Sequence, residues 1–184
     1  MSDKAIILHV PRGKTGLPPL PVDMTRIYEG EGRLKEIAYV TPVTSRELSS
    51  YFNEVCNEAN KYIAWVEYEI LQATKTFDLC RAKVILEKAP AEAQKLKDSG
   101  LGKPNEDWRE ALVTMDEDCQ AALDSLNNLK AIKALLESKA KTFERAYFSA
   151  KLNNDEKTMA SPNFSGTIGQ LSDPQKNFMG KAQI

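Results

Sequence analysis

Apolar residues recur at helical spacing along two long stretches of the 184-residue chain. From Leu48 to Val84 they return every three or four residues, which is the pattern of a helix face packed on a core. From Trp108 to Ala150 they follow alternating steps of four and three, and only Lys133 departs from this heptad pattern. The two patterns predict long helices over about residues 45–98 and 106–152.

Both predicted helices carry local signals at their ends. The sequence TSRE at 44–47 has the form of a capping box for the first helix, and Asn105 followed by two acidic residues is a typical start for the second. Pro90 removes one helical hydrogen bond and predicts a kink or a restart near the end of the first helix. The glycines and the proline of SGLGKPNED at 99–107 predict the turn between the helices.

Two helices of matched length joined by a short turn should lie antiparallel. The expected fold class is therefore all-α, with a long antiparallel helical hairpin of coiled-coil type over residues 44–152. Two helices alone seldom bury enough apolar area to offset chain entropy, so we expect a homo-oligomer. Apolar residues that lie off the main seams would form the subunit interface, namely Leu71, Leu79, Leu86, Leu123, Ile132 and Leu135.

The chain outside the hairpin follows neither helical pattern. Residues 1–43 hold two short β-like runs, AIILHV at 5–10 and KEIAYV at 35–40, and the prolines and glycines between them predict no regular structure. We expect an extended N-terminal arm there. Its RGKTG is not a phosphate-binding P-loop, because Leu8 occupies the position of the required glycine. Residues 153–184 predict an irregular tail, either mobile or docked through spaced apolar residues.

A second stripe of side chains runs along the first helix beside its core face. Its aromatic residues have two interpretations. They are either core or subunit contacts, or a base-stacking platform, because aromatic rings with interleaved cations are what single-stranded nucleic acid binds. The stripe consists of Lys61, Trp65, Tyr68, Gln72 and Lys75.

Charge leaves both interpretations open. The net charge of −1 gives no general attraction to nucleic acid or anionic lipid, so any such binding needs a local patch. Arg81, Lys83 and Lys88 form a local basic run on the first helix. The alternative is that these are ordinary solvated charges of a helix surface.

Several function classes find no support in the sequence. His9 is the only histidine and lies in the arm, which disfavours histidine-based catalysis. Cys56, Cys80 and Cys119 are odd in number and stand far apart, which is typical of reduced core thiols rather than of a disulfide or a zinc site. We therefore predict no enzyme activity, no metal and no cofactor. No apolar run suits a membrane span or a signal peptide, so we expect a cytoplasmic protein without a membrane partner.

Three segments of the predicted helices carry motifs beyond the heptad pattern. They are EANKYIAWVEYE at 58–69, CRAK at 80–83 and LVTMDEDCQAALDSL at 112–126. The first places Tyr62 and Trp65 in a Tyr-x-x-Trp, and the second places Arg81 and Lys83 in a basic-Ala-basic triplet. The third has an Asp-x-Asp followed by a Ser-Leu. In this order the motifs resemble the UvsY-like recombination mediator family of T-even phages, over about residues 50–150.

The resemblance implies a ring-forming helical protein that binds single-stranded DNA, helps to displace the single-strand-binding protein and loads a recombinase. It implies phosphate contacts for Arg81 and Lys83, and a location in the host cytoplasm if the protein is phage-encoded. The rival hypothesis is a virion or assembly component, a helical oligomer whose arm and tail extend over neighbouring subunits. With the stripe and the basic run, the predicted nucleic-acid-binding residues are Arg81, Lys83, Lys88, Lys61, Lys75 and Trp65.

Overall fold

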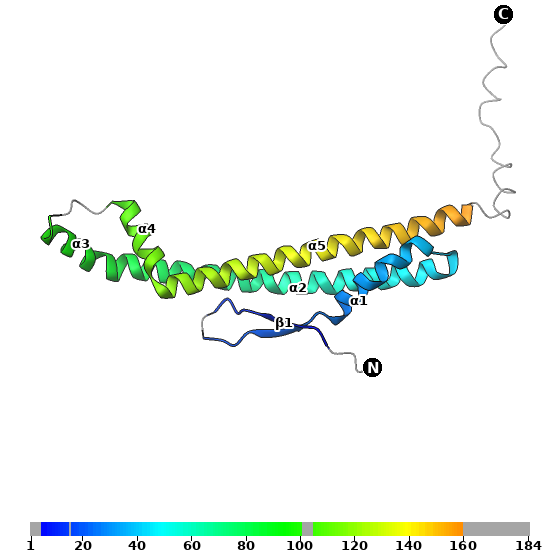
Figure 1. Cartoon of the computed structure of the whole chain (residues 1–184), viewed down its shortest axis with the longest axis horizontal. Helices are drawn as coiled ribbons and strands as arrows, with labels where there is room; N and C mark the ends of the chain where they lie inside the picture. Colours follow the sequence, from blue (N-terminus) through cyan, green and yellow to red (C-terminus); the bar gives the residue numbers. More distant parts are fainter. Residues whose placement is uncertain (1–4, 15, 101–104, 160–184) are drawn as a thin grey trace, which may run out of the picture.

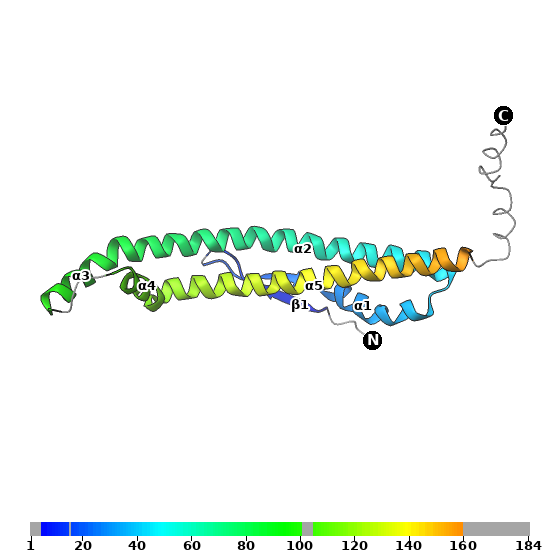
Figure 2. The same ribbon diagram turned by 90° about the horizontal axis from the view of Figure 1, so that it is seen from above.

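The computed structural model describes residues 5–14, 16–100 and 105–159 and confirms a mostly helical chain built on a long antiparallel hairpin (Figure 1). Its two main helices, α2 and α5, contain 42 and 43 residues and lie side by side in both views (Figures 1 and 2). The elements in chain order are β1 (Ile7–Val10), β2 (Leu20–Asp23), α1 (Thr25–Arg33), the 3-10 helix η1 (Leu34–Tyr39), α2 (Pro42–Lys83), the π-helical turn η2 (Val84–Lys88), α3 (Ala89–Asp98), α4 (Glu106–Met115) and α5 (Glu117–Met159).

The seam between α2 and α5 is the main core of the protein. Near one end the rings of Phe52 and Phe143 stack with 6.4 Å between their centroids. Lys133, the polar exception in the heptad pattern, places its Nζ 2.8 Å from Glu67 Oε1 at the edge of the seam, while its aliphatic stem covers the helix. The predicted heptad residues of α5 that are buried here are Cys119, Ala122, Leu126, Leu129, Leu136, Ala140, Phe143 and Ala150.

The start of α2 differs from the prediction by a few residues. Thr41 is the N-cap, its Oγ1 accepting from the Thr44 amide at 3.3 Å, and Thr44 Oγ1 accepts from the Thr41 amide at 3.0 Å. Pro42 fits the first turn because an amide there would have no helical partner. The capping box predicted with Thr44 as its first residue is therefore wrong. Glu47, its expected second member, instead pairs with Arg33 at 3.3 Å.

The break predicted near Pro90 is confirmed and has a defined geometry. The Ala89 amide donates to the Val84 carbonyl oxygen, five residues back, where an α-helix would use the carbonyl four residues back. Pro90 has no amide, and its ring clashes with a regularly placed carbonyl in the preceding turn. The wide turn η2 accommodates this conflict, after which α3 begins.

The second helix is not continuous, which corrects the prediction of one unbroken helix over 106–152. Asn105 caps α4 as expected, accepting from the Trp108 amide at 2.9 Å. At Asp116 the backbone is extended, with φ −79° and ψ 120°, and its Oδ1 accepts from the Cys119 amide at 3.1 Å to cap α5. Aspartate is a strong N-cap residue, so the side chain competes with helix continuation at this point. Figure 1 shows α4 turning away from the axis of α5.

The N-terminal residues are folded, and the prediction of no regular structure between the two β-like runs is wrong. The strand expected at 5–10 forms as β1, but it pairs antiparallel with β2, with Leu8 opposite Val22 and Val10 opposite Leu20. Side chains of a strand alternate between its two faces, so Val10 and Val22 turn to the helices while His9 stays exposed. β2 and α1 both lie in the stretch for which no element was predicted.

The β-like reading of KEIAYV is also wrong, because these residues form most of η1. Leu34 and Ile37 pack against the core and Val40 is buried, and these three residues are spaced by three. That spacing is the period of a 3-10 helix, whereas a strand would alternate every second residue. The KEIAYV segment therefore shows one apolar edge to α2 and α5.

A buried carboxylate holds the arm on the hairpin. Glu69 of α2 is 2% exposed, and its two oxygens accept from Arg12 Nε at 2.9 Å and from the Gly13 amide at 2.8 Å. Thr76 Oγ1 donates to the Gly13 carbonyl at 2.9 Å. A Cβ on Gly13 would lie 2.0 Å from the Glu69 carbonyl oxygen. The arm therefore lies so close to α2 at this position that only glycine fits.

The docked arm supplies part of the cover that the two helices lack. Val10, Val22, Met24 and Ile27 join one core cluster with residues of α2 and α5. Self-association was predicted because two helices alone bury too little apolar surface. The arm of the same chain covers part of that surface. The tail predicted over 153–184 begins as helix, since α5 continues to Met159, and residues 160–184 lie outside the described residues.

Replacing Gly13 by alanine tests this docking. We expect Gly13→Ala to lower the free energy of unfolding in urea by about 1–3 kcal/mol, because the added methyl group overpacks against the backbone of α2. Gly32→Ala is the matched control. Gly32 lies in α1 with nothing within 4 Å of an added Cβ, so its replacement should be neutral or stabilising. Equal stability of wild type and Gly13→Ala would contradict the docking.

Candidate nucleic-acid and assembly surface

One side of α2 carries a row of exposed side chains that points away from the core. Residues seven apart on a helix lie nearly above one another, so residues 61, 68 and 75 share a face, as do 79 and 86. This face lies opposite the buried residues Val66 and Ala73. We call it the outer face of α2, and it consists of Lys61, Tyr68, Leu71, Lys75 and Leu79 of α2, together with Leu86 of the following turn η2.

The outer face has two parts of different chemistry. Its N-terminal part holds Lys61 and Lys75 with Tyr68 between them, the tyrosine being 57% exposed. Neither lysine makes an ion pair with any residue that the structure describes. Its C-terminal part is apolar, with Leu79 72% and Leu86 75% exposed. Lysines suit solvent by themselves, so the exposed Leu79 and Leu86 are the side chains of this face that favour a partner.

The Trp65 side chain is less exposed to solvent than a base-stacking platform requires. Its side chain is half-buried and packs against the core cluster that α2 shares with α5 and the arm. Tyr68 is the exposed aromatic of the predicted stripe and points to solvent. The stripe therefore splits into a packed aromatic residue, Trp65, and an exposed one, Tyr68.

Two of the three residues of the basic run, Arg81 and Lys88, form ion pairs within the protein. Arg81 contacts Glu110 of α4, and this hydrogen bond raises the pKa of the guanidinium. Lys88 contacts Asp116, which raises the pKa of the ammonium. Lys83 is exposed and makes no ion pair within the described part of the chain. The structure thus does not bring the three cations together as one unpaired patch.

The predicted interface residues of α5 occupy mixed environments. Leu135 is exposed, while Leu123 is half-buried. Ile132 packs against the protein's own core, which leaves less of it for a partner. The stronger candidates for a subunit contact are therefore Leu79 and Leu86, together with Leu71.

Sequence reasoning missed Glu69, although the sequence contained a signal. Val66, Glu69 and Ala73 are spaced by three and four, so the acid lies in the register of the core face. An acid in that register has to find a partner when buried. The partner, Arg12, lies 57 residues away, and no local pattern identifies it.

Comparison with known proteins adds no relatives. No protein-family model, no curated protein and no solved structure matches the chain. None of the helices in the described ranges has the length and apolar character needed to cross a membrane.

Self-association through the leucines can be tested directly. We expect the full-length protein to show a mass above that of the monomer in light scattering at micromolar concentration. Leu79→Asp combined with Leu86→Asp should reduce the mass to the monomer and leave helicity unchanged, because both side chains are outside the core. Tyr39→Asp, at an 83% exposed position of η1, is the control and should remain oligomeric. A monomeric wild type would refute the assignment.

Proposed function

We propose that the protein binds single-stranded DNA on the outer face of α2 and acts as an oligomeric recombination mediator. In this role it helps to load a recombinase onto DNA covered by single-strand-binding protein, in the cytoplasm and without catalysis. The family resemblance of the helices supports the biological role. The observation that carries the DNA interaction is the exposed Tyr68 between two unpaired lysines.

The Lys61–Tyr68–Lys75 arrangement has the chemistry that single strands require. Lys61 and Lys75 are separated by about 21 Å along the helix, from 14 residues at 1.5 Å each, so they span several nucleotides. The cations attract phosphates, and the ring of Tyr68 offers a flat apolar surface to one base. Because every base has a stacking face, this arrangement predicts binding with little sequence preference.

Arg81, Lys83 and Lys88 lie farther toward the end of the hairpin, and Arg81 and Lys88 face α4 and Asp116 rather than the outer face. The Arg81–Glu110 pair lies at the surface, where solvent weakens ion pairs, so a phosphate can replace the glutamate. Arg81 and Lys83 project about 200° apart on one helix, so neighbouring subunits would have to present them to one strand. Their contribution therefore belongs to the oligomer.

A second candidate function is an assembly component, and the exposed Leu79 and Leu86 favour it. An apolar row of this kind buries well against a second helix without any nucleic acid. In that case the protein would self-associate and bind no DNA. The two functions therefore differ in one measurement, the salt-sensitive binding of a single strand.

The lysines should supply a salt-dependent part of the affinity. We expect Lys61→Ala with Lys75→Ala to weaken binding of a labelled oligothymidylate several-fold and to make the slope of log affinity against log salt shallower by about 1.4, for two phosphate contacts. Lys130→Ala with Lys151→Ala removes the same charge from exposed positions of α5 and should have a smaller effect. A wild-type protein without salt-sensitive binding would leave the assembly function as the better account.

Tyr68 should contribute a part of the affinity for single-stranded DNA that changes little with salt concentration. We expect Tyr68→Ala to cost about 1–3 kcal/mol of binding free energy at each salt concentration, because base stacking involves no counterion release. Tyr39→Ala is the matched control, since Tyr39 is an exposed tyrosine of η1 and does not belong to the outer face of α2. If Trp65→Ala weakens binding in a folded protein and Tyr68→Ala does not, the stacking residue has been misassigned.

A further inference from the structure

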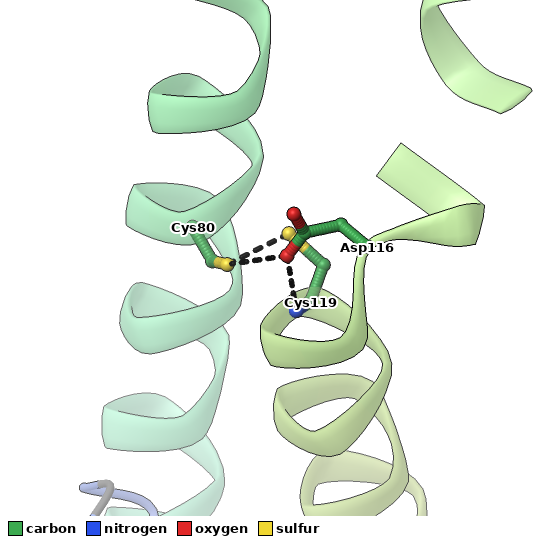
Figure 3. A group of neighbouring side chains, drawn as sticks. All are labelled: Cys80, Asp116 and Cys119. Carbon is green, nitrogen blue, oxygen red and sulfur yellow. Dashed lines mark hydrogen bonds between the residues drawn. The ribbon is translucent and has the colours of Figure 1, made fainter. Parts of the chain in front are cut away.

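Two of the three cysteines meet at the end of the hairpin, although they are 39 residues apart. Cys80 comes from α2 and Cys119 from the first turn of α5, and the thiol of Cys119 donates to Cys80 Sγ at 2.7 Å (Figure 3). Asp116 Oδ1 accepts from the Cys80 thiol at 3.9 Å. The three cysteines are free, and the antiparallel packing of the helices brings together two thiols that stand far apart in the chain.

We propose that Cys80, Cys119 and Asp116 form a binding site for a thiophilic divalent cation, with Zn²⁺ as the best fit. Their ligand atoms all lie within 4.8 Å of one another. Two thiolates and a carboxylate are a ligand set that zinc accepts, and hard cations such as Mg²⁺ do not favour sulfur. A fourth, non-protein ligand such as water would complete a tetrahedron.

The distances need only a small adjustment. Zinc bonds of about 2.3 Å to sulfur place two tetrahedral thiolates about 3.8 Å apart, so the two sulfurs would separate by about 1 Å. Side-chain rotation supplies a movement of this size without moving the helices. Cys119 and Asp116 are buried, and Cys80 is half-buried, so solvent competes weakly for the ion.

The surroundings orient the carboxylate toward the sulfurs. Oδ1 of Asp116 faces the thiols and accepts from the Cys119 amide, while Oδ2 contacts Lys88. These contacts lower the pKa of Asp116, the Lys88 hydrogen bond having the largest effect, so the group is a carboxylate. One dication, two thiolates and one carboxylate have a net charge of −1, which Lys88 neutralises.

An open groove borders the site on the side of Asp116. The groove has a volume of about 420 Å³ and is lined by Val84, Lys88 and Met115 as well as Asp116, whereas neither cysteine lines it, so an ion would reach the thiols past the Asp116 carboxylate.

A disulfide is the alternative use of the same two thiols. Burial, followed by the hydrogen bond to Cys80, raises the pKa of Cys119 to about 12, so both a disulfide and a thiolate–metal bond require loss of the thiol proton at neutral pH. A metal ion can still bind by displacing the thiol protons to solvent.

Cobalt provides a spectroscopic test of the full-length protein. The reduced, metal-free protein should bind one Co²⁺ per chain with a near-ultraviolet thiolate-to-cobalt band and the strong visible bands of tetrahedral Co²⁺, and Zn²⁺ should displace it. Cys80→Ser and Cys119→Ser should lose the thiolate band. Asp116→Asn, which preserves an N-cap for α5, should weaken binding at least tenfold.

Cys56→Ser is the matched control, because Cys56 is half-buried elsewhere on α2 and donates to the Ala140 carbonyl. It should bind Co²⁺ as the wild type does. Zn²⁺ should also raise the melting temperature of the wild type and of Cys56→Ser but not of Cys80→Ser. A folded, reduced wild type without the thiolate band would overturn the proposal, as would equal loss in Cys56→Ser. Circular dichroism establishes that each variant is folded.

Discussion

The seam between α2 and α5 is stable only if its flanks are covered, and the structure depends on this constraint. Two packed helices bury one stripe each and leave apolar residues exposed at both edges. The N-terminal arm covers one flank with Val10, Val22, Met24 and Ile27. The buried Glu69 carboxylate holds the arm there by accepting hydrogen bonds from Arg12 and from the Gly13 amide. A segment rich in proline and glycine thereby becomes part of the core.

This cover determines which surface remains for a partner. Trp65 packs toward the core, while Tyr68 and the leucines of the outer face remain exposed. Lysines and an aromatic ring occupy the N-terminal part of that face, and leucines occupy its C-terminal part. A single helix can therefore offer nucleic acid and a neighbouring subunit separate segments of one continuous face. The site proposed at Cys80 and Cys119 lies at the end of the same helix and would fasten it to α5.

The sequence predicted those parts of the fold that rest on local or periodic signals. The heptad pattern identified most of the buried residues of α5, and Asn105 and Pro90 marked a helix start and a break correctly. The folded arm was missed because its contacts, such as Arg12 with Glu69, join residues far apart in the chain. The meeting of Cys80 and Cys119 depends on the register of the two helices, which periodicity alone does not specify. The spacing of Leu34, Ile37 and Val40 was a local signal that a β interpretation overlooked.

Hydroxyl-radical footprinting of the full-length protein tests the central claim most directly, namely that the arm leaves the outer face of α2 as the surface for single-stranded DNA. Labelling rates of Tyr68, Trp65 and Tyr39 would be measured with and without oligothymidylate. The account predicts that DNA protects Tyr68, leaves Tyr39 unchanged and has little effect on Trp65, which is already half-buried. Protection of Tyr39 with none at Tyr68, or equal labelling of Tyr68 in both conditions, would contradict it.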